Sequence, residues 1–221
     1  MKQTIQTALR DLFSPKVILY VLKTALAALG ISLLLIWLLW DSLTGLTTSF
    51  LGWIPWEWLQ TTGAGAINIL LVYILFIIIV SLLTSLTSET LLKKLAQKHY
   101  PHIPAEGTPR MRTSLLLTLK ATGLFLLLFI PAIPLLFIPV AGQIIMLYLW
   151  SVLIKKPIAY DVGVLFGMEE INTEKKATTL AMIASLFNYI PLLSIFTPVF
   201  AQILFLHFAL SPKDNRNLYY R

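Results

Sequence analysis

The sequence predicts an all-α integral membrane protein, and three observations lead to that prediction. The chain is 57% hydrophobic and only 12% charged, which is about half the charged fraction of an ordinary soluble domain. Its apolar residues gather in long runs separated by short polar connections. Lys and Arg are confined to some of these connections, as the positive-inside rule requires of cytoplasmic segments. We therefore expect two long transmembrane helices and two short proline-broken helical hairpins, with the N- and C-termini cytoplasmic.

The composition also excludes several classes of protein. No cysteine is present, which excludes disulfides, thiol chemistry and cysteine metal sites. The formal charge is +7, but the basic residues lie between apolar runs, so lipid headgroups are favoured over nucleic acid as their partner. We expect a single membrane domain, residues 1–221, with the lipid bilayer as a partner and no cofactor.

Residues 1–13 predict a short amphipathic helix lying at the membrane interface. Its apolar residues recur at near-helical spacing: Ile5, Leu9, Leu12 and Phe13. Ser14 and Pro15 then predict the start of a long helix, because serine favours the N-cap and proline the first helical position.

Residues 16–88 predict a long helical hairpin. Its first helix runs to about Trp40, and because this apolar run is longer than a usual signal core we expect it to be retained. The second helix runs from about Gly65 to Ser88. Each is about 35 Å long, enough to span a bilayer. The connection 41–64 contains no Lys or Arg, so we expect it on the far side.

Residues 113–154 and 177–210 predict two further hairpins, each broken by prolines. Their four arms cover roughly 113–130, 140–154, 177–190 and 198–210, and are about 20–27 Å long against a hydrocarbon core of about 30 Å. No charge lies in 131–139 or 190–198. We therefore expect these tips to stop inside the membrane or the bilayer to thin around them.

The two short hairpins share a sequence repeat. The tetrapeptide 133–136 recurs as 190–193, and a Pro-Val-x-x-Gln-Ile pattern begins at both Pro139 and Pro198. If each proline opens the second arm of its hairpin, the following backbone N–H groups have no intrahelical partner and attract anions. Gly142, Gln143 and Gln202 are therefore candidate anion-binding residues. Alternatively, the glutamines only hydrogen-bond neighbouring helices and the prolines only make turns.

The other polar residues predict no catalytic or metal site. His99 and His102 are separated by Pro101, and no further ligand clusters with them in the sequence. Asp161 and the acidic group that follows it, at 169–174, are interpreted as a solvated loop. Asn68, Asn188 and His207 are interpreted as ordinary interhelical hydrogen-bonding groups. No catalytic motif is present, so an enzyme is not expected.

Several short motifs resemble the CysZ-type sulfate permeases, which belong with the etoposide-induced membrane protein family. They are the segment 137–143 (FIPVAGQ), Trp150, Tyr160-Asp161, the segment 185–193 (SLFNYIPLL) and Pro198-Val199. The resemblance covers roughly 113–208 and, more loosely, 12–40. It implies an inner-membrane protein with two long helices, two partly inserted hairpins, homo-oligomerisation and sulfate uptake.

One position departs from this family pattern. The family's sulfate site uses a Gly-Leu/Ile-Arg stretch just after the proline that opens the first helix, and here that stretch reads Lys16-Val17-Ile18. The role of the arginine is therefore not transferred. Lys16 and Lys23 are the candidate sources of positive charge, although lysine lacks the planar fork of arginine.

Two functions remain open from the sequence. The first is a permease or channel for a small inorganic anion, with sulfate as the leading candidate, in the cell inner membrane. The second is a non-transporting multi-pass scaffold or partner-binding protein. They differ in whether the short hairpins enclose a wet space.

Overall fold

The computed structural model describes residues 1–52, 55–136, 138–168 and 175–211, and within these ranges every regular element is helical. The elements are, in order, α1 (Lys2–Leu12), α2 (Pro15–Leu51), α3 (Glu57–Thr87), α4 (Glu89–His99), α5 (Met111–Leu136), α6 (Ala141–Leu165), α7 (Lys175–Ser185), η2 (Leu186–Tyr189), α8 (Pro191–Ser194) and α9 (Thr197–Leu210). The predicted all-α class is confirmed. The acidic group at 169–174 and the tail beyond 211 lie outside the described residues.

Helices α2 and α3 form the predicted long hairpin, with Ser14 at the N-cap and Pro15 in the first turn of α2. Both helices are longer than predicted, since α2 continues beyond Trp40 to Leu51 and α3 begins at Glu57 rather than Gly65. The prediction ended the helices where the strongly apolar runs end, but helical hydrogen bonding continues through Thr, Ser and Gly.

The surface of this hairpin is apolar and exposed. Trp37, Ile69 and Phe50 are 76%, 73% and 71% exposed. A small buried cluster centred on Ala28, Ile79 and Val80 joins α2 to α3, as does a hydrogen bond of 2.7 Å between Tyr20 and Thr87. An exposed apolar surface of this extent indicates contact with lipid. In the described part of the chain, three helical segments are long and apolar enough to cross a membrane: Pro15–Leu51, Gln60–Thr87 and Met111–Ala132.

Helices α5 and α6 form the second hairpin, and here the predicted arm lengths are wrong. Helix α5 has 26 residues and α6 has 25, because α5 continues past Pro131 and α6 continues past Lys155 and Lys156 to Leu165. Asp161 consequently lies on a helix, not in a solvated loop. The prediction placed helix ends at prolines and charges, but α6 contains Pro157 without ending there.

The third hairpin has the short arms that the sequence predicts. Helices α7 and α9 contain 11 and 14 residues, and η2 and α8 connect them. Every residue of α9 is buried, and α9 packs against α1, α3, α4, α6 and α7. An apolar helix that is surrounded by other helices forms the centre of a core, and the main hydrophobic cluster of the structure is built around it.

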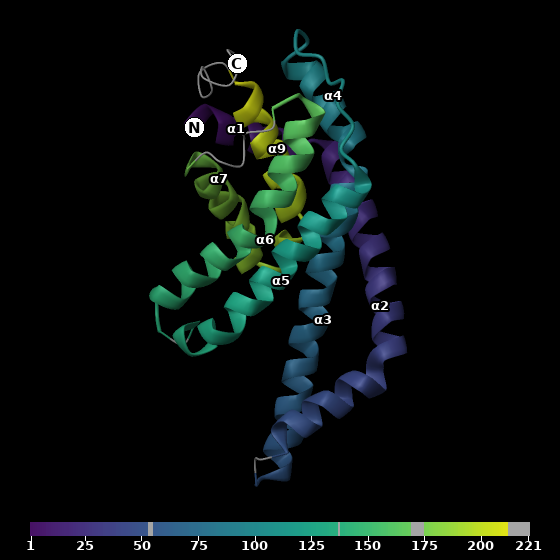
Figure 1. Cartoon of the computed structure of the whole chain (residues 1–221), viewed down its shortest axis with the longest axis vertical. Helices are drawn as coiled ribbons and strands as arrows, with labels where there is room; N and C mark the ends of the chain where they lie inside the picture. Colours follow the sequence, from purple (N-terminus) through teal and green to yellow (C-terminus); the bar gives the residue numbers. More distant parts are fainter. Residues whose placement is uncertain (53–54, 137, 169–174, 212–221) are drawn as a thin grey trace.

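Figure 1 shows that this core lies at one end of the molecule. The α2–α3 hairpin extends well beyond it, whereas the α5–α6 hairpin slants away from α3 and reaches only about the level of the middle of α3 along the long axis. Whether the α5–α6 hairpin is only partly inserted is not tested by this arrangement, since α5 contains a segment long enough to cross a membrane. The depth of the tips in a bilayer stays a prediction.

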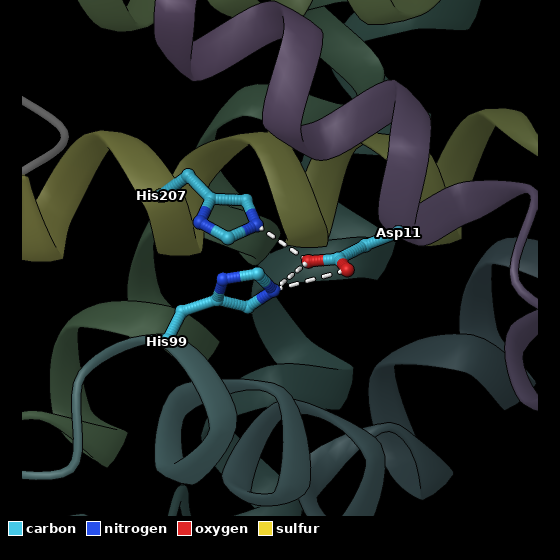
Figure 2. Close-up of side chains that lie close together, drawn as sticks. All are labelled: Asp11, His99 and His207. Carbon is cyan, nitrogen blue, oxygen red and sulfur yellow. Dashed lines mark hydrogen bonds and ion pairs between the residues drawn. The ribbon is translucent and has the colours of Figure 1, made fainter.

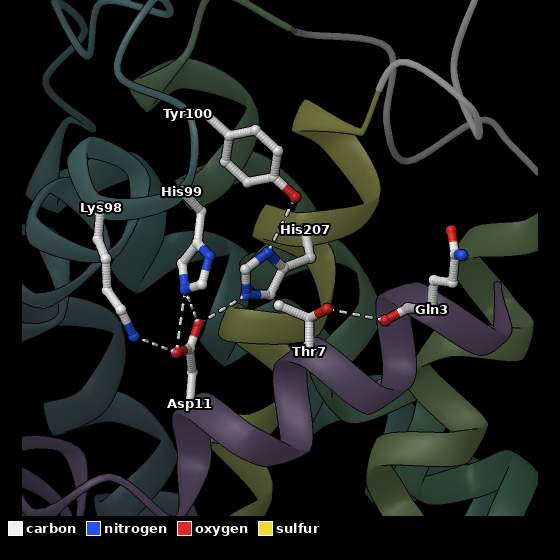
Figure 3. A network of polar contacts seen from close by, with 7 residues as sticks. All are labelled: Gln3, Thr7, Asp11, Lys98, His99, Tyr100 and His207. Atoms are coloured by element: carbon white, nitrogen blue, oxygen red, sulfur yellow. Dashed lines mark hydrogen bonds and ion pairs between the residues drawn. The ribbon is translucent and has the colours of Figure 1, made fainter.

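Helix α1 lies against α9 at the core end, and a polar network joins them (Figure 3). The buried carboxylate of Asp11 accepts hydrogen bonds from Lys98 Nζ at 3.0 Å and His207 Nε2 at 3.0 Å, and His99 Nε2 lies 2.8 Å away. Burial alone would raise the pKa of Asp11, but the hydrogen bonds from Lys98, His99 and His207 outweigh it, so the pKa lies below its usual value.

The buried face of α1 differs from the predicted apolar one. Thr4, Ala8, Asp11 and Leu12 face the protein, and Phe13 is 60% exposed. Asp11 takes a place in this face because its three cationic or imidazole partners compensate for the loss of water.

The position of Lys and Arg predicts that the core end is cytoplasmic and that the α2–α3 tip is on the opposite side. With no native cysteine, Trp56→Cys and Lys94→Cys provide single labelling sites, both exposed. We expect an impermeant maleimide to label position 56 in intact cells and position 94 only after permeabilisation. Labelling of position 94, but not 56, in intact cells would reverse the topology.

Candidate functional site

A cavity of about 490 Å³ lies between α5, α6 and the start of α7. Three lysines reach it: Lys120 from α5, and Lys155 and Lys156 from α6. Tyr148, Ser151 and Thr178 add polar atoms to the wall, and four apolar side chains complete it: Leu117, Ala121, Leu124 and Val152. The cavity is therefore large, basic and partly polar.

The charge in this cavity is not neutralised by any acidic group that the structure describes. No Asp or Glu is among its lining residues. Lys155 Nζ donates a hydrogen bond to Thr178 Oγ1 at 2.9 Å, which fixes one ammonium group toward α7. Three ammonium groups around one open space raise the local concentration of anions. The chemistry that this space favours is reversible binding of a small anion.

A second polar feature lies between α3 and α5. Side-chain hydroxyls recur every fourth residue on α5, at Ser114, Thr118 and Thr122. Thr118 and Thr122 line a small cavity together with Ser81 and Ser85 of α3. Ser114 and Ser85 line a groove beside this cavity. Residues four apart share one face of a helix. These hydroxyls form a polar seam, here called the hydroxyl seam, between helices that are otherwise apolar.

Asp161 closes one end of the hydroxyl seam. Ser114 Oγ donates to its Oδ1 at 2.6 Å, and Ser85 Oγ donates to its Oδ2. The side chain is 2% exposed. Burial raises the pKa of Asp161 to about 6, because desolvation outweighs the two hydrogen bonds. Sequence analysis missed this role, although the four-residue spacing of hydroxyls on α5 was visible.

Gln202 lies deep in the protein, at the other end of the hydroxyl seam. It is 1% exposed, and its Oε1 atom is without a hydrogen-bond partner, as are Ser81 Oγ and Thr122 Oγ1. All three residues line a cavity of about 20 Å³, which has room for one water molecule. Three polar atoms around one such space match the partners that a buried water needs.

The structure does not bring the predicted site residues together. Gln143 is exposed at the start of α6, whereas Gln202 is in the core. Lys16 and Lys23 are exposed on α2. None of these four residues lines the basic cavity.

After Pro139, two of the backbone N–H groups that were predicted to be free are hydrogen-bonded. The N–H of Gly142 donates to Ile138 O at 2.8 Å, and the N–H of Ala141 donates to Pro139 O at 2.7 Å. Pro139 precedes α6 by two residues, with Val140 between them at a positive φ of 66°. In the second copy Pro198 does lie in the first turn of α9. The two copies therefore share a sequence pattern but not a local structure.

Comparison with known proteins gives one result. The family described as sulfate transporter CysZ/etoposide-induced protein 2.4 matches residues 4–198. The chain belongs to this family. No curated protein and no solved structure matches the chain. Membership in a transporter family, together with three membrane-length helices, identifies a multi-pass membrane protein and confirms the resemblance seen in the sequence.

Asp161 predicts a pH-dependent contribution to stability. An acid whose pKa is raised on folding stabilises the folded state below its unfolded pKa of 3.8, and this stabilisation is lost as pH rises through about 6. Between pH 5 and pH 8 we expect the free energy of unfolding of the parent to fall by about 1 kcal/mol relative to that of Asp161→Asn, because asparagine carries no titrating proton. Thermal unfolding of both proteins in detergent across this range measures the difference.

The acidic neighbour Glu89 lines the same groove and is paired with Lys93 at 2.6 Å. Glu89→Gln is therefore the matched control. Glu89→Gln keeps Asp161 and should therefore retain the pH dependence of the parent. A stability difference between the parent and Asp161→Asn that is constant from pH 5 to pH 8 would contradict the assignment, as would a Glu89→Gln variant that loses the pH dependence as fully as Asp161→Asn does.

Proposed function

We propose that this protein is a permease for a small inorganic anion, sulfate first among the candidates, in the cell inner membrane. The observation that carries the proposal is the basic cavity between α5, α6 and α7, whose three lysines face a space of about 490 Å³ without an acidic residue among its lining. Membership in a family described as sulfate transporters supports the same conclusion.

The chemistry of the cavity suits an anion of high charge. A hydrated ion fits, because the volume is many times the ~30 Å³ that one water occupies in the liquid. Each ammonium group offers three donors to anion oxygens. Lys155 is held in place by Thr178, whereas Lys120 and Lys156 are exposed. A site with two exposed lysines binds an anion weakly and releases it readily, as transport requires.

The basic cavity and the small cavity near Gln202 share no lining residue. Residues Leu117, Lys120, Ala121 and Leu124 of α5 face the basic cavity, but Thr118 and Thr122 face the small cavity near Gln202. The α5–α6 pair therefore separates the two spaces. Passage of an anion requires these helices to move apart, or a path along the surface that α5 and α6 present to a second copy of the chain. This favours a permease over a permanently open channel.

Lys16 and Lys23 retain a proposed role at the cytoplasmic side. They lie near the start of α2 and are exposed, so they raise the concentration of anions near the surface and do not coordinate one in the basic cavity. The arginine that the family places after its first proline has no counterpart here, and we propose that the cavity lysines provide the charge in its place.

The decisive measurement is anion flux into liposomes that contain the purified protein. We expect sulfate to enter, and Lys120→Gln and Lys155→Gln each to reduce its flux about three- to tenfold, since each removes one charge-assisted contact. Lys94→Gln is the matched control, because Lys94 is an exposed lysine of α4 outside the cavity. Its flux should equal that of the parent.

Two results would contradict the proposal. If the parent moves sulfate and both cavity variants move it equally well, the cavity is not the site. If the parent moves none of sulfate, phosphate and chloride, the protein is a multi-pass scaffold, the alternative function that the sequence left open.

The repeated glutamines give a second prediction in the same assay. Gln202 lies in the core with its amide oxygen unpartnered, whereas the backbone oxygen of Gln143 accepts a hydrogen bond from Tyr189 and its side chain is exposed. If both glutamines contact the anion, Gln143→Leu and Gln202→Leu should each lower sulfate flux several-fold, as loss of one neutral donor costs about 1 kcal/mol. Equal flux in two well-folded variants would make them packing groups.

A further inference from the structure

Two histidines and one aspartate meet at the core end of the molecule (Figure 2). Asp11 comes from α1, His99 from the last position of α4, and His207 from α9. One ligand atom from each lies within 4.8 Å of the others. Neither the basic cavity nor the hydroxyl seam includes any of them, and the proposed anion transport makes no use of them.

Both histidines approach the carboxylate of Asp11. His207 Nε2 lies 3.0 Å from Asp11 Oδ2, and His99 Nε2 lies 2.8 Å from Oδ2 and 3.0 Å from Oδ1. Ligands bound at about 2.0–2.1 Å in a tetrahedral arrangement lie about 3.3 Å apart. The two nitrogen–oxygen distances to Oδ2 therefore need to lengthen by only a few tenths of an ångström to accept an ion, and all three ligand atoms already lie within 4.8 Å of one another.

The donor set selects the kind of ion. Two imidazole nitrogens and one carboxylate oxygen suit zinc and related transition metals, whereas magnesium and calcium prefer oxygen ligands alone. Three protein ligands leave a fourth position for water. His99 is 27% exposed, whereas His207 and Asp11 are each 1% exposed, so an ion enters from the side of His99.

The surrounding groups orient the ligands. Tyr100 Oη lies 3.0 Å from His207 Nδ1, and a tyrosine hydroxyl can either donate to this nitrogen or accept from it. Without an ion, His207 Nε2–H donates to Asp11 and Nδ1 accepts from Tyr100. With an ion, the imidazole takes its other neutral tautomer: Nε2 gives up its proton to solvent and Nδ1 takes one from solvent. Nδ1–H then donates to Tyr100, the outer partner that metal-bound histidines usually have.

Lys98 is the group that opposes a cation here. Its Nζ contacts Asp11 Oδ1 at 3.0 Å, whereas His207 contacts Oδ2. His99 lies within hydrogen-bonding distance of both oxygens. The Lys98 side chain is 61% exposed, so its ammonium group can move into solvent when an ion binds. Lys98 thus lowers the affinity of the site without blocking it.

We propose that Asp11, His99 and His207 form a site for one divalent transition-metal ion, zinc by its chemistry, which ties α1 and α4 to α9. The bound ion replaces two hydrogen bonds with three coordinate bonds. It therefore stabilises the packing of the first helix of the chain against the central one.

The test uses the full-length protein in detergent, purified on a tag that contains no histidine. Cobalt serves as a spectroscopic substitute for zinc, and its visible d–d absorption reports a tetrahedral nitrogen and oxygen site. We expect one ion per chain, displacement of cobalt by zinc, and a rise in the melting temperature with zinc but not with magnesium. His99→Gln and Asp11→Asn should weaken binding by at least about tenfold, and Tyr100→Phe by less.

His102→Gln is the matched control, because His102 is exposed and only three residues from His99. Its affinity for cobalt should equal that of the parent. Absence of cobalt and zinc binding by the folded parent would show that the cluster is a hydrogen-bond network only. Equal losses in His99→Gln and His102→Gln would also overturn the proposal, since binding would then be adventitious. The stabilisation of the parent by zinc requires no variant, so the test survives if Asp11→Asn fails to fold.

Discussion

An apolar helix of fourteen residues, about 21 Å long, is too short to cross a hydrocarbon core of about 30 Å. Helix α9 has this length, and the arrangement of the protein around it follows from that limit. Its apolar surface must be covered on all sides, and α1, α3, α4, α6 and α7 cover it. Lipid covers the longer α2–α3 hairpin instead, whose side chains remain exposed in the isolated chain. One molecule thus combines a protein-lined core with a lipid-facing hairpin.

Burial on all sides leaves polar groups with few partners. Asp161 of α6 provides a partner for two hydroxyls of the seam, Ser85 of α3 and Ser114 of α5. Hydroxyls of this kind join membrane helices at a modest gain of about 0.6 kcal/mol each. The basic cavity lies on the opposite face of the α5–α6 pair. The same two helices therefore supply packing contacts on one face and positive charge on the other, which links any movement of α5 and α6 to the exposure of the lysines.

Much of this architecture follows from local sequence. The serine and proline at positions 14 and 15, the apolar runs and the short arms of the last hairpin each depend on a few neighbouring residues, and the structure agrees with them. The end of α6 could not be predicted from local sequence. Lys155, Lys156 and Pro157 resemble a helix end, but α6 continues to Leu165. The Asp11 cluster was not predictable, since its histidines lie 88 and 196 residues from Asp11 in the chain. The lining of the basic cavity depends likewise on which faces α5 and α6 present to α7.

The pairing of α1 with α9 has a consequence for biogenesis. Helix α1 leaves the ribosome before α9, and α9, the helix that covers it, is the last element that the structure describes. Until α9 is synthesised, Asp11 has no His207 to meet, and α1 must rest on the membrane surface with its carboxylate hydrated. The hairpins α2–α3 and α5–α6 can insert in order during this interval, because each is closed by contacts near in sequence. Final assembly of the core is therefore a late, post-insertion event, and a chain interrupted before α9 would expose the face of α1 to cellular quality control.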